Sequence, residues 1–166
     1  MTNFPSISAL GTNGRVVAAR LRPGQDVIKA IEATCVQHGI IAGQITSSIG
    51  SLRRIAYNYV TRTERGDGTG YTTKVERDGA FSVLAGQGLV SPGDEPGRLN
   101  IHYHAVVSDD KNVITGGHIL PGTITLTTMD LFVVEILDVE IVRARDEETG
   151  AVITSFYPTV GSNSCS

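Results

Sequence analysis

Short runs rich in apolar and β-branched residues, separated by Gly, Pro and polar turns, predict strands along most of the chain. The exception is residues 25–37, where Val27 and Ile31 recur at the spacing of one helical face. Asp26 lies near the positive end of that helix dipole, and Gly39 accepts the left-handed conformation that ends many helices. This is the one helix that the pattern predicts.

The expected strands are bounded by turn residues. They cover residues 15–21, 40–49, 54–62, 80–84, 99–107, 113–120, 124–142 and 152–156, with polar or Gly/Pro-rich loops at 64–70 and 86–97. A strand, a helix and then many strands with hairpin-like spacing predict an α+β fold, an antiparallel-rich β-sheet with one main helix packed on it. We expect an irregular N-terminal arm at 1–13, a single domain at 14–157 and a polar C-terminal tail at 158–166.

Length and charge limit the classes of function. A chain of 166 residues with 40% hydrophobic residues suits one domain with a real core. The 14 Lys and Arg against 17 Asp and Glu provide no general basic field for nucleic acid, so DNA contact would need a local patch. Because no leader or membrane span is visible, we expect a cytoplasmic protein with no membrane partner.

Other motifs are absent or weak. Cys35 and Cys165 lie far apart, so no disulfide framework is expected. No phosphate loop and no dinucleotide fingerprint occur, so ATP, GTP and NAD are not indicated as cofactors.

Three histidines form the candidate site. In a strand, residues two apart project to the same face, so His102 and His104 should point together. His118 follows one turn later on the expected partner strand. A three-residue turn centred near Asp110 would pair 102 with 118, whereas a two-residue turn would place His118 on the opposite face. Gly116-Gly117 before His118 would allow a bulge or a close approach by another group.

Three neutral imidazoles with one open position are a familiar site for Zn²⁺ and accept other divalent metals. Glu135 or Asp130 could supply a fourth ligand, a second-shell acceptor or a base. The alternative for His102 and His104 is a purely structural pair, hydrogen-bonded on a half-exposed strand face. The metal hypothesis predicts zinc as the cofactor and a small molecule as a ligand, with residues 86–97 as a lid.

An ordered set of motifs resembles the plants-and-prokaryotes conserved (PPC or PCC) domain family. The set runs in order over about residues 14–157 and is fairly specific. Its members are Leu21-Arg22-Pro23-Gly24-Gln25-Asp26, Ile45-Thr46-Ser47-Ser48-Ile49-Gly50-Ser51-Leu52, Gly79-Ala80-Phe81-Ser82-Val83-Leu84, Ile101-His102-Tyr103-His104, Gly116-Gly117-His118 and Asp146-Glu147-Glu148-Thr149-Gly150.

The resemblance implies a helix packed on an antiparallel-rich sheet and assembly as a homotrimer. It also implies that His102, His104 and His118 form a metal or small-ligand site near a subunit boundary, as in prokaryotic members. Plant members contact DNA through a separate Arg-Gly-Arg-Pro AT-hook, which this sequence lacks, so the chain resembles the prokaryotic stand-alone type. The plant partner-interaction signature Gly-Arg-Phe-Glu-Ile-Leu appears here with Ala80 and Ser82 in place of Arg and Glu.

Two functional hypotheses follow from the sequence. One is a trimeric DNA-associated or regulatory module, and the other is a metal-dependent enzyme or binder that acts on a small molecule. A purely structural trimer is the third outcome, if neither DNA nor metal is bound. The sequence leaves open whether the protein is an enzyme.

Overall fold

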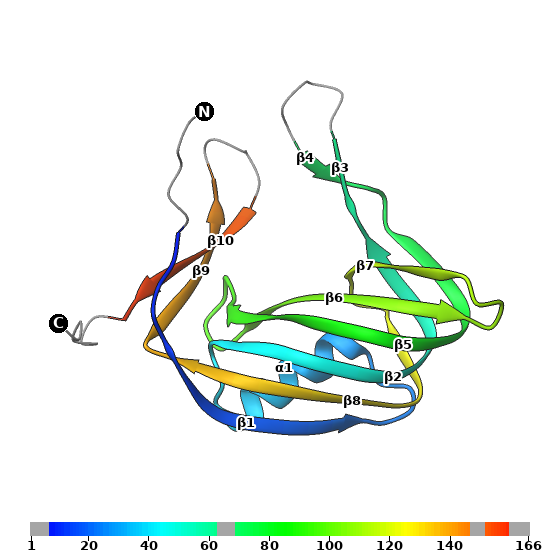
Figure 1. Ribbon diagram of the computed structural model, residues 1–166, viewed down its shortest axis with the longest axis horizontal. Helices are drawn as coiled ribbons and strands as arrows, with labels where there is room; N and C mark the ends of the chain where they lie inside the picture. Colours follow the sequence, from blue (N-terminus) through cyan, green and yellow to red (C-terminus); the bar gives the residue numbers. More distant parts are fainter. Residues whose placement is uncertain (1–6, 63–68, 147–151, 160–166) are drawn as a thin grey trace.

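The protein is described here by a computed structural model, in which residues 7–62, 69–146 and 152–159 are placed well enough to describe. The elements are β1 (Thr12–Leu21), α1 (Val27–His38), β2 (Gly43–Asn58), β3 (Val60–Arg62), β4 (Thr69–Tyr71), β5 (Val75–Pro92), β6 (Leu99–Asp109), β7 (Ile114–Ile119), β8 (Ile124–Leu137), β9 (Val139–Arg145) and β10 (Val152–Pro158). Six of them form one antiparallel sheet in the order β1-β8-β2-β5-β6-β7. The pairs β3-β4 and β9-β10 project from this sheet as two arms (Figure 1).

The helix forms as the sequence predicts, and both ends are capped. The Asp26 side chain accepts a hydrogen bond from the backbone N–H of Lys29, and Gly39 has a left-handed φ of 65°. Val27, Ile31 and other residues of one helical face are buried against the sheet. An antiparallel-rich sheet with one helix in the described part of the chain confirms the predicted fold class.

One of the expected breaks between strands is absent. Residues 40–49 and 54–62 were expected as separate strands, but β2 runs without a turn through Gly50. A Cβ at Gly50 would lie 2.4 Å from the carbonyl oxygen of Thr128. Glycine here lets β8 approach closely and does not mark a turn.

The expected loop at 86–97 is also mostly strand. Positions 86–92 belong to β5 and pair with β6, so only residues 93–98 connect the two strands. A Cβ at Gly86 would lie 1.9 Å from the hydroxyl oxygen of Tyr103, so this glycine again permits close packing. The lid expected at 86–97 is therefore wrong, because most of it is fixed in the sheet.

Two further expectations change in detail. The strand expected at 124–142 is divided by Asp138, whose φ of 65° ends β8 and redirects the chain into β9. Of the loop expected at 64–70, residues 64–68 lie outside the described residues, and the remainder begins β4. No helix in the described part of the chain is long and apolar enough to cross a membrane.

The sheet curls at one end because β2 has three partners. Along most of its length β2 pairs with β5 and β8, but its last residues pair with β7, with Tyr57 opposite Ile119 and Asn58 opposite His118. This pairing closes β2, β5, β6 and β7 into a ring. The closure lies at the position of His118, so the fold itself fixes one residue of the candidate site.

Candidate metal centre

Strand β6 places His102 and His104 on the face of the sheet opposite the helix. The residues between and beside them point the other way, and Tyr103 is buried in the core with 1% of its surface exposed. This alternation follows from the two-residue period of a strand. It keeps the two imidazoles on one face, with His102 partly buried and His104 exposed.

His118 joins them through the β6–β7 hairpin. His104 lies directly opposite His118 in the pairing of β6 with β7. The sequence analysis considered a register with His102 opposite His118, so the observed register differs from it by two residues. A shift of two residues keeps all three rings on one face. The Asp109 carboxylate sets this turn by accepting hydrogen bonds from the backbone N–H groups of Lys111 and Val113.

The two glycines before His118 permit this arrangement by their small size. A Cβ at Gly117 would lie 2.4 Å from the carbonyl oxygen of Asn58, and one at Gly116 would lie 2.1 Å from that of Ala105. No real side chain tolerates such distances to backbone atoms. Glycine at these positions therefore allows β6 and β2 to flank β7 closely.

The three imidazoles converge. The Nε2 atoms of His102 and His104 are 3.0 Å apart, and the ring centroids of the three pairs are separated by 5.0, 4.9 and 5.2 Å. One nitrogen from each ring lies within 4.8 Å of the others. Tetrahedral zinc with Zn–N bonds of about 2.05 Å requires nitrogens about 3.4 Å apart. The cluster is thus close to the geometry of three zinc ligands.

The surroundings keep these imidazoles neutral. Burial lowers the pKa of His102 to about 4, with smaller contributions from His118, Arg143 and His104. Burial is also the main cause that lowers the pKa of His104 and of His118. A neutral imidazole has a free lone pair, which is the form that binds a metal.

One nitrogen of the cluster has no hydrogen-bond partner. The Nδ1 atom of His118 is buried and unpaired, as are Oδ1 of the neighbouring Asn58 and Nε of Arg143. Buried polar atoms without partners cost free energy, and they are uncommon in folded proteins. A cluster of neutral imidazoles with an unsatisfied nitrogen fits the donor set of a metal ion.

The two acidic residues expected beside the histidines lie elsewhere. Glu135 and Asp130 belong to β8, which is separated from β6 by β2 and β5 in the sheet. The Glu135 carboxylate binds Arg15 at 2.6 Å, and that of Asp130 binds Arg20 at 2.6 Å. Within the described ranges, the only group of three or more residues whose ligand atoms lie close enough to hold a metal ion consists of the three histidines. The structure therefore does not bring Glu135 or Asp130 into this cluster.

Sequence reasoning missed two residues beside the cluster. The ring of Tyr71 on β4 lies 5.9 Å from that of His118, and Arg143 on β9 is close enough to lower the pKa of His102 and His118. Both come from arms whose position relative to β6 follows from tertiary structure alone. No local motif around either residue could have identified it.

Comparisons with known proteins agree with this picture. A profile of the Plants and Prokaryotes Conserved (PCC) domain matches residues 8–137. The chain is 30% identical over 136 residues to the bifunctional protein GlmU of Synechococcus sp. strain JA-3-3Ab, a match that covers 82% of this chain. It spans about a fifth of the length of the curated relatives that it matches, 20% in this case.

Solved structures share the fold. A metal-containing protein from Archaeoglobus fulgidus is 25% identical with a TM-score of 0.74, and the match covers 90% of this chain and 98% of that one. A protein from Bacteroides thetaiotaomicron, described as a candidate DNA-binding protein, is 19% identical with a TM-score of 0.70 and covers 89% and 99% of the two chains. With most of its length matched by the family profile, the chain belongs to the Plants and Prokaryotes Conserved domain family.

Proposed function

We propose that His102, His104 and His118 bind one divalent metal ion, with zinc as the first candidate. The observation that carries the proposal is the convergence of three neutral imidazoles, one of which has a buried unpaired nitrogen. The similarity to a metal-containing protein of Archaeoglobus fulgidus supports it. Three protein ligands are the usual number in sites that keep a position open for water or substrate.

A bound ion of this kind can orient a small molecule, polarise it, or lower the pKa of a bound water to about 7. The residues of this chain would hold the ion, limit solvent access and orient the ligand. A metal-dependent binder or enzyme that acts on a small molecule is therefore the function that this site supports best. Location in the cytoplasm stays a prediction.

Elemental analysis of the purified protein tests the proposal. We expect about one metal ion per chain, and loss of most of it in His104→Ala. His38→Ala is the matched control, because His38 is exposed at the end of α1 and should keep full metal content. A protein that takes up no divalent metal after loading with Zn²⁺ would refute the proposal.

We also propose that the chain forms a homotrimer. Ile49, Leu84, Val106 and Phe132 lie on the outer face of the sheet and each has at least 44% of its surface exposed. Two adjoining hollows on this face contain all four residues, and the first hollow also contains His104. Contiguous exposed apolar surface of this kind is typical of protein interfaces. Light scattering should give three times the chain mass of 17.6 kDa, and a monomer would contradict this.

Association with DNA is the second candidate function. It is supported by the fold shared with the Bacteroides thetaiotaomicron protein. Of the basic residues Arg53 and Arg54, the second is paired with Glu76 and Asp78, which leaves little free positive charge there. Binding should therefore be weak and strongly salt-dependent. A gel-shift series without binding at low salt would exclude it.

A further inference from the structure

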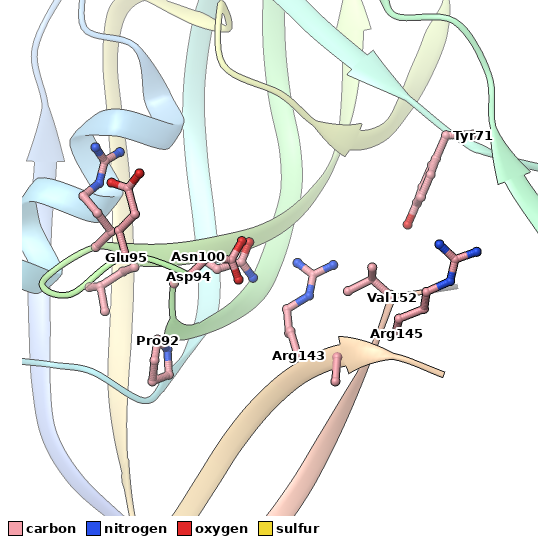
Figure 2. Close-up of a pocket in the computed structure, with 12 residues that line it drawn as sticks. Tyr71, Pro92, Asp94, Glu95, Asn100, Arg143, Arg145 and Val152 are labelled. Carbon is pink, nitrogen blue, oxygen red and sulfur yellow. The ribbon is translucent and has the colours of Figure 1, made fainter. Parts of the chain in front are cut away.

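A cleft of about 780 Å³ lies beside the histidine cluster, a size that suits a small molecule. It is bounded by the β5–β6 connection, the start of β6, the end of β9 and Tyr71 of β4 (Figure 2). Its polar side chains are Tyr71, Asp94, Glu95, Arg98, Asn100, Arg143 and Arg145.

The cleft and the histidines share two elements. Asn100 lines the cleft and precedes His102 by two residues on β6, so the two side chains project from the same face of one strand. Tyr71 also lines the cleft, and its ring is 5.9 Å from the ring of His118. A ligand in the cleft would therefore lie next to the proposed metal.

Two arginines of the cleft have no acidic partner. Arg143 and Arg145 alternate along β9 and thus share a face, and neither forms an ion pair with a carboxylate of the described residues. The Nε atom of Arg143 is buried without any hydrogen-bond partner. By contrast, Arg98 in the same cleft is held by Glu32 at 2.7 Å. Arg143 therefore has a buried donor nitrogen for which no acceptor is found within the described part of the chain.

Charge is distributed unevenly along the cleft. Figure 2 shows Asp94 and Glu95 toward the β5–β6 connection, whereas Arg143, Arg145 and Tyr71 lie toward the arms. The positive end is therefore the end formed by β4 and β9. A guanidinium with free N–H groups binds carboxylate and phosphate through charge-assisted hydrogen bonds.

We infer that this cleft binds a small-molecule oxyanion, a carboxylate or a phosphate ester, through Arg143, with Arg145 and Tyr71 at its side. The inference rests on the proposed metal site, because it assigns a ligand class to the open position of that ion. Arg143 would hold the anionic group while the same molecule, or a second oxygen of the same group, faces the histidines.

Calorimetric titration of the zinc-loaded protein, in the oligomeric state in which it is purified, tests whether the cleft binds an oxyanion. Inorganic phosphate and succinate are the two probes, and their relative affinities distinguish the phosphate and carboxylate sources. At least one should bind, and Arg143→Gln should weaken it by about tenfold or more, since a charge-assisted pair is lost. Arg145→Gln should weaken it less, and Arg22→Gln, an exposed arginine outside the cleft, should leave it unchanged.

Zinc content, measured on every variant, separates this inference from the metal proposal. Arg143→Gln should keep its zinc while losing the anion, which supports both statements. Normal zinc content with no anion binding in the unaltered protein, or equal binding in Arg143→Gln, would overturn the inference and leave the metal site standing. Failure of the unaltered protein to hold zinc would instead overturn the metal site on which the inference rests.

Discussion

The β1–β8 edge of the sheet and the β6–β7 end differ in whether their polar side chains have partners within the chain. At the edge, Glu135 and Asp130 are bound by Arg15 and Arg20 through two hydrogen bonds from each guanidinium. At the other end, neutral imidazoles face one another, and His118 and Arg143 keep buried nitrogens without partners. Polar groups already satisfied within the chain support the fold, whereas unsatisfied ones mark where a ligand belongs.

The largest effect should come from removing one imidazole. His118→Ala should lower zinc affinity by more than about 100-fold, because it removes one of three ligands. Glu135→Gln is the comparison at the other edge and should keep wild-type affinity. Competition with a chromophoric chelator measures both, and equal affinities in the two variants would remove the distinction between these regions.

The second-largest effect should come from disturbing the pairing of β7 with β2, which holds His118 in place. Gly117→Ala would add a Cβ at 2.4 Å from the carbonyl oxygen of Asn58, so β2 and β7 must separate. We expect a loss of about 2 kcal/mol in the free energy of unfolding and weaker zinc binding. Urea denaturation with and without zinc checks this. Unchanged stability would show that the β2–β7 pairing does not hold His118 in place.

Acid should destabilise the metal-free protein through the same histidines. The pKa of His102 is about 4 in the folded state against an ordinary value of 6.5, so the unfolded chain takes up a proton first. The stability linked to His102 is complete above pH 6.5 and is lost as the pH falls toward 4. His102→Asn should lose less thermal stability over this window than the unaltered chain, and parallel curves would contradict the assignment.

The smallest effect should follow from breaking an edge ion pair. Asp130→Asn removes the contact with Arg20, whose side chain is 68% exposed. Exposed pairs contribute about 0.2–1 kcal/mol, so thermal unfolding should shift only slightly. The zinc content of Asp130→Asn should equal that of the unaltered protein. A loss of zinc in this variant would indicate that Asp130 contributes to metal binding.

The sequence was sufficient where local rules decide the structure. The Asp26 and Gly39 caps and the alternation of His102 and His104 each follow from neighbouring residues. The family resemblance rests on motifs whose order can be read directly along the chain. Gly50 and Gly86 misled because a glycine that permits close packing has the same local appearance as one that forms a turn.

Local sequence patterns could not predict which side chains from distant strands lie beside the histidines. A single sequence does not show that β2 and β5 lie between β8 and β6 in the sheet. For this reason the sequence could not exclude Glu135 and Asp130 as neighbours of the histidines. Arg143 and Tyr71 were missed for the same reason. Each reaches the cleft on an arm that is distant in the sequence from β6.

X-ray absorption at the zinc edge of the loaded protein tests the central claim most directly. The account predicts three imidazole nitrogens at about 2.0–2.1 Å with a light-atom ligand in the remaining position, and loss of this signal in His118→Ala. A first shell of carboxylate oxygens, or one unchanged by that substitution, would contradict a metal centre formed by His102, His104 and His118.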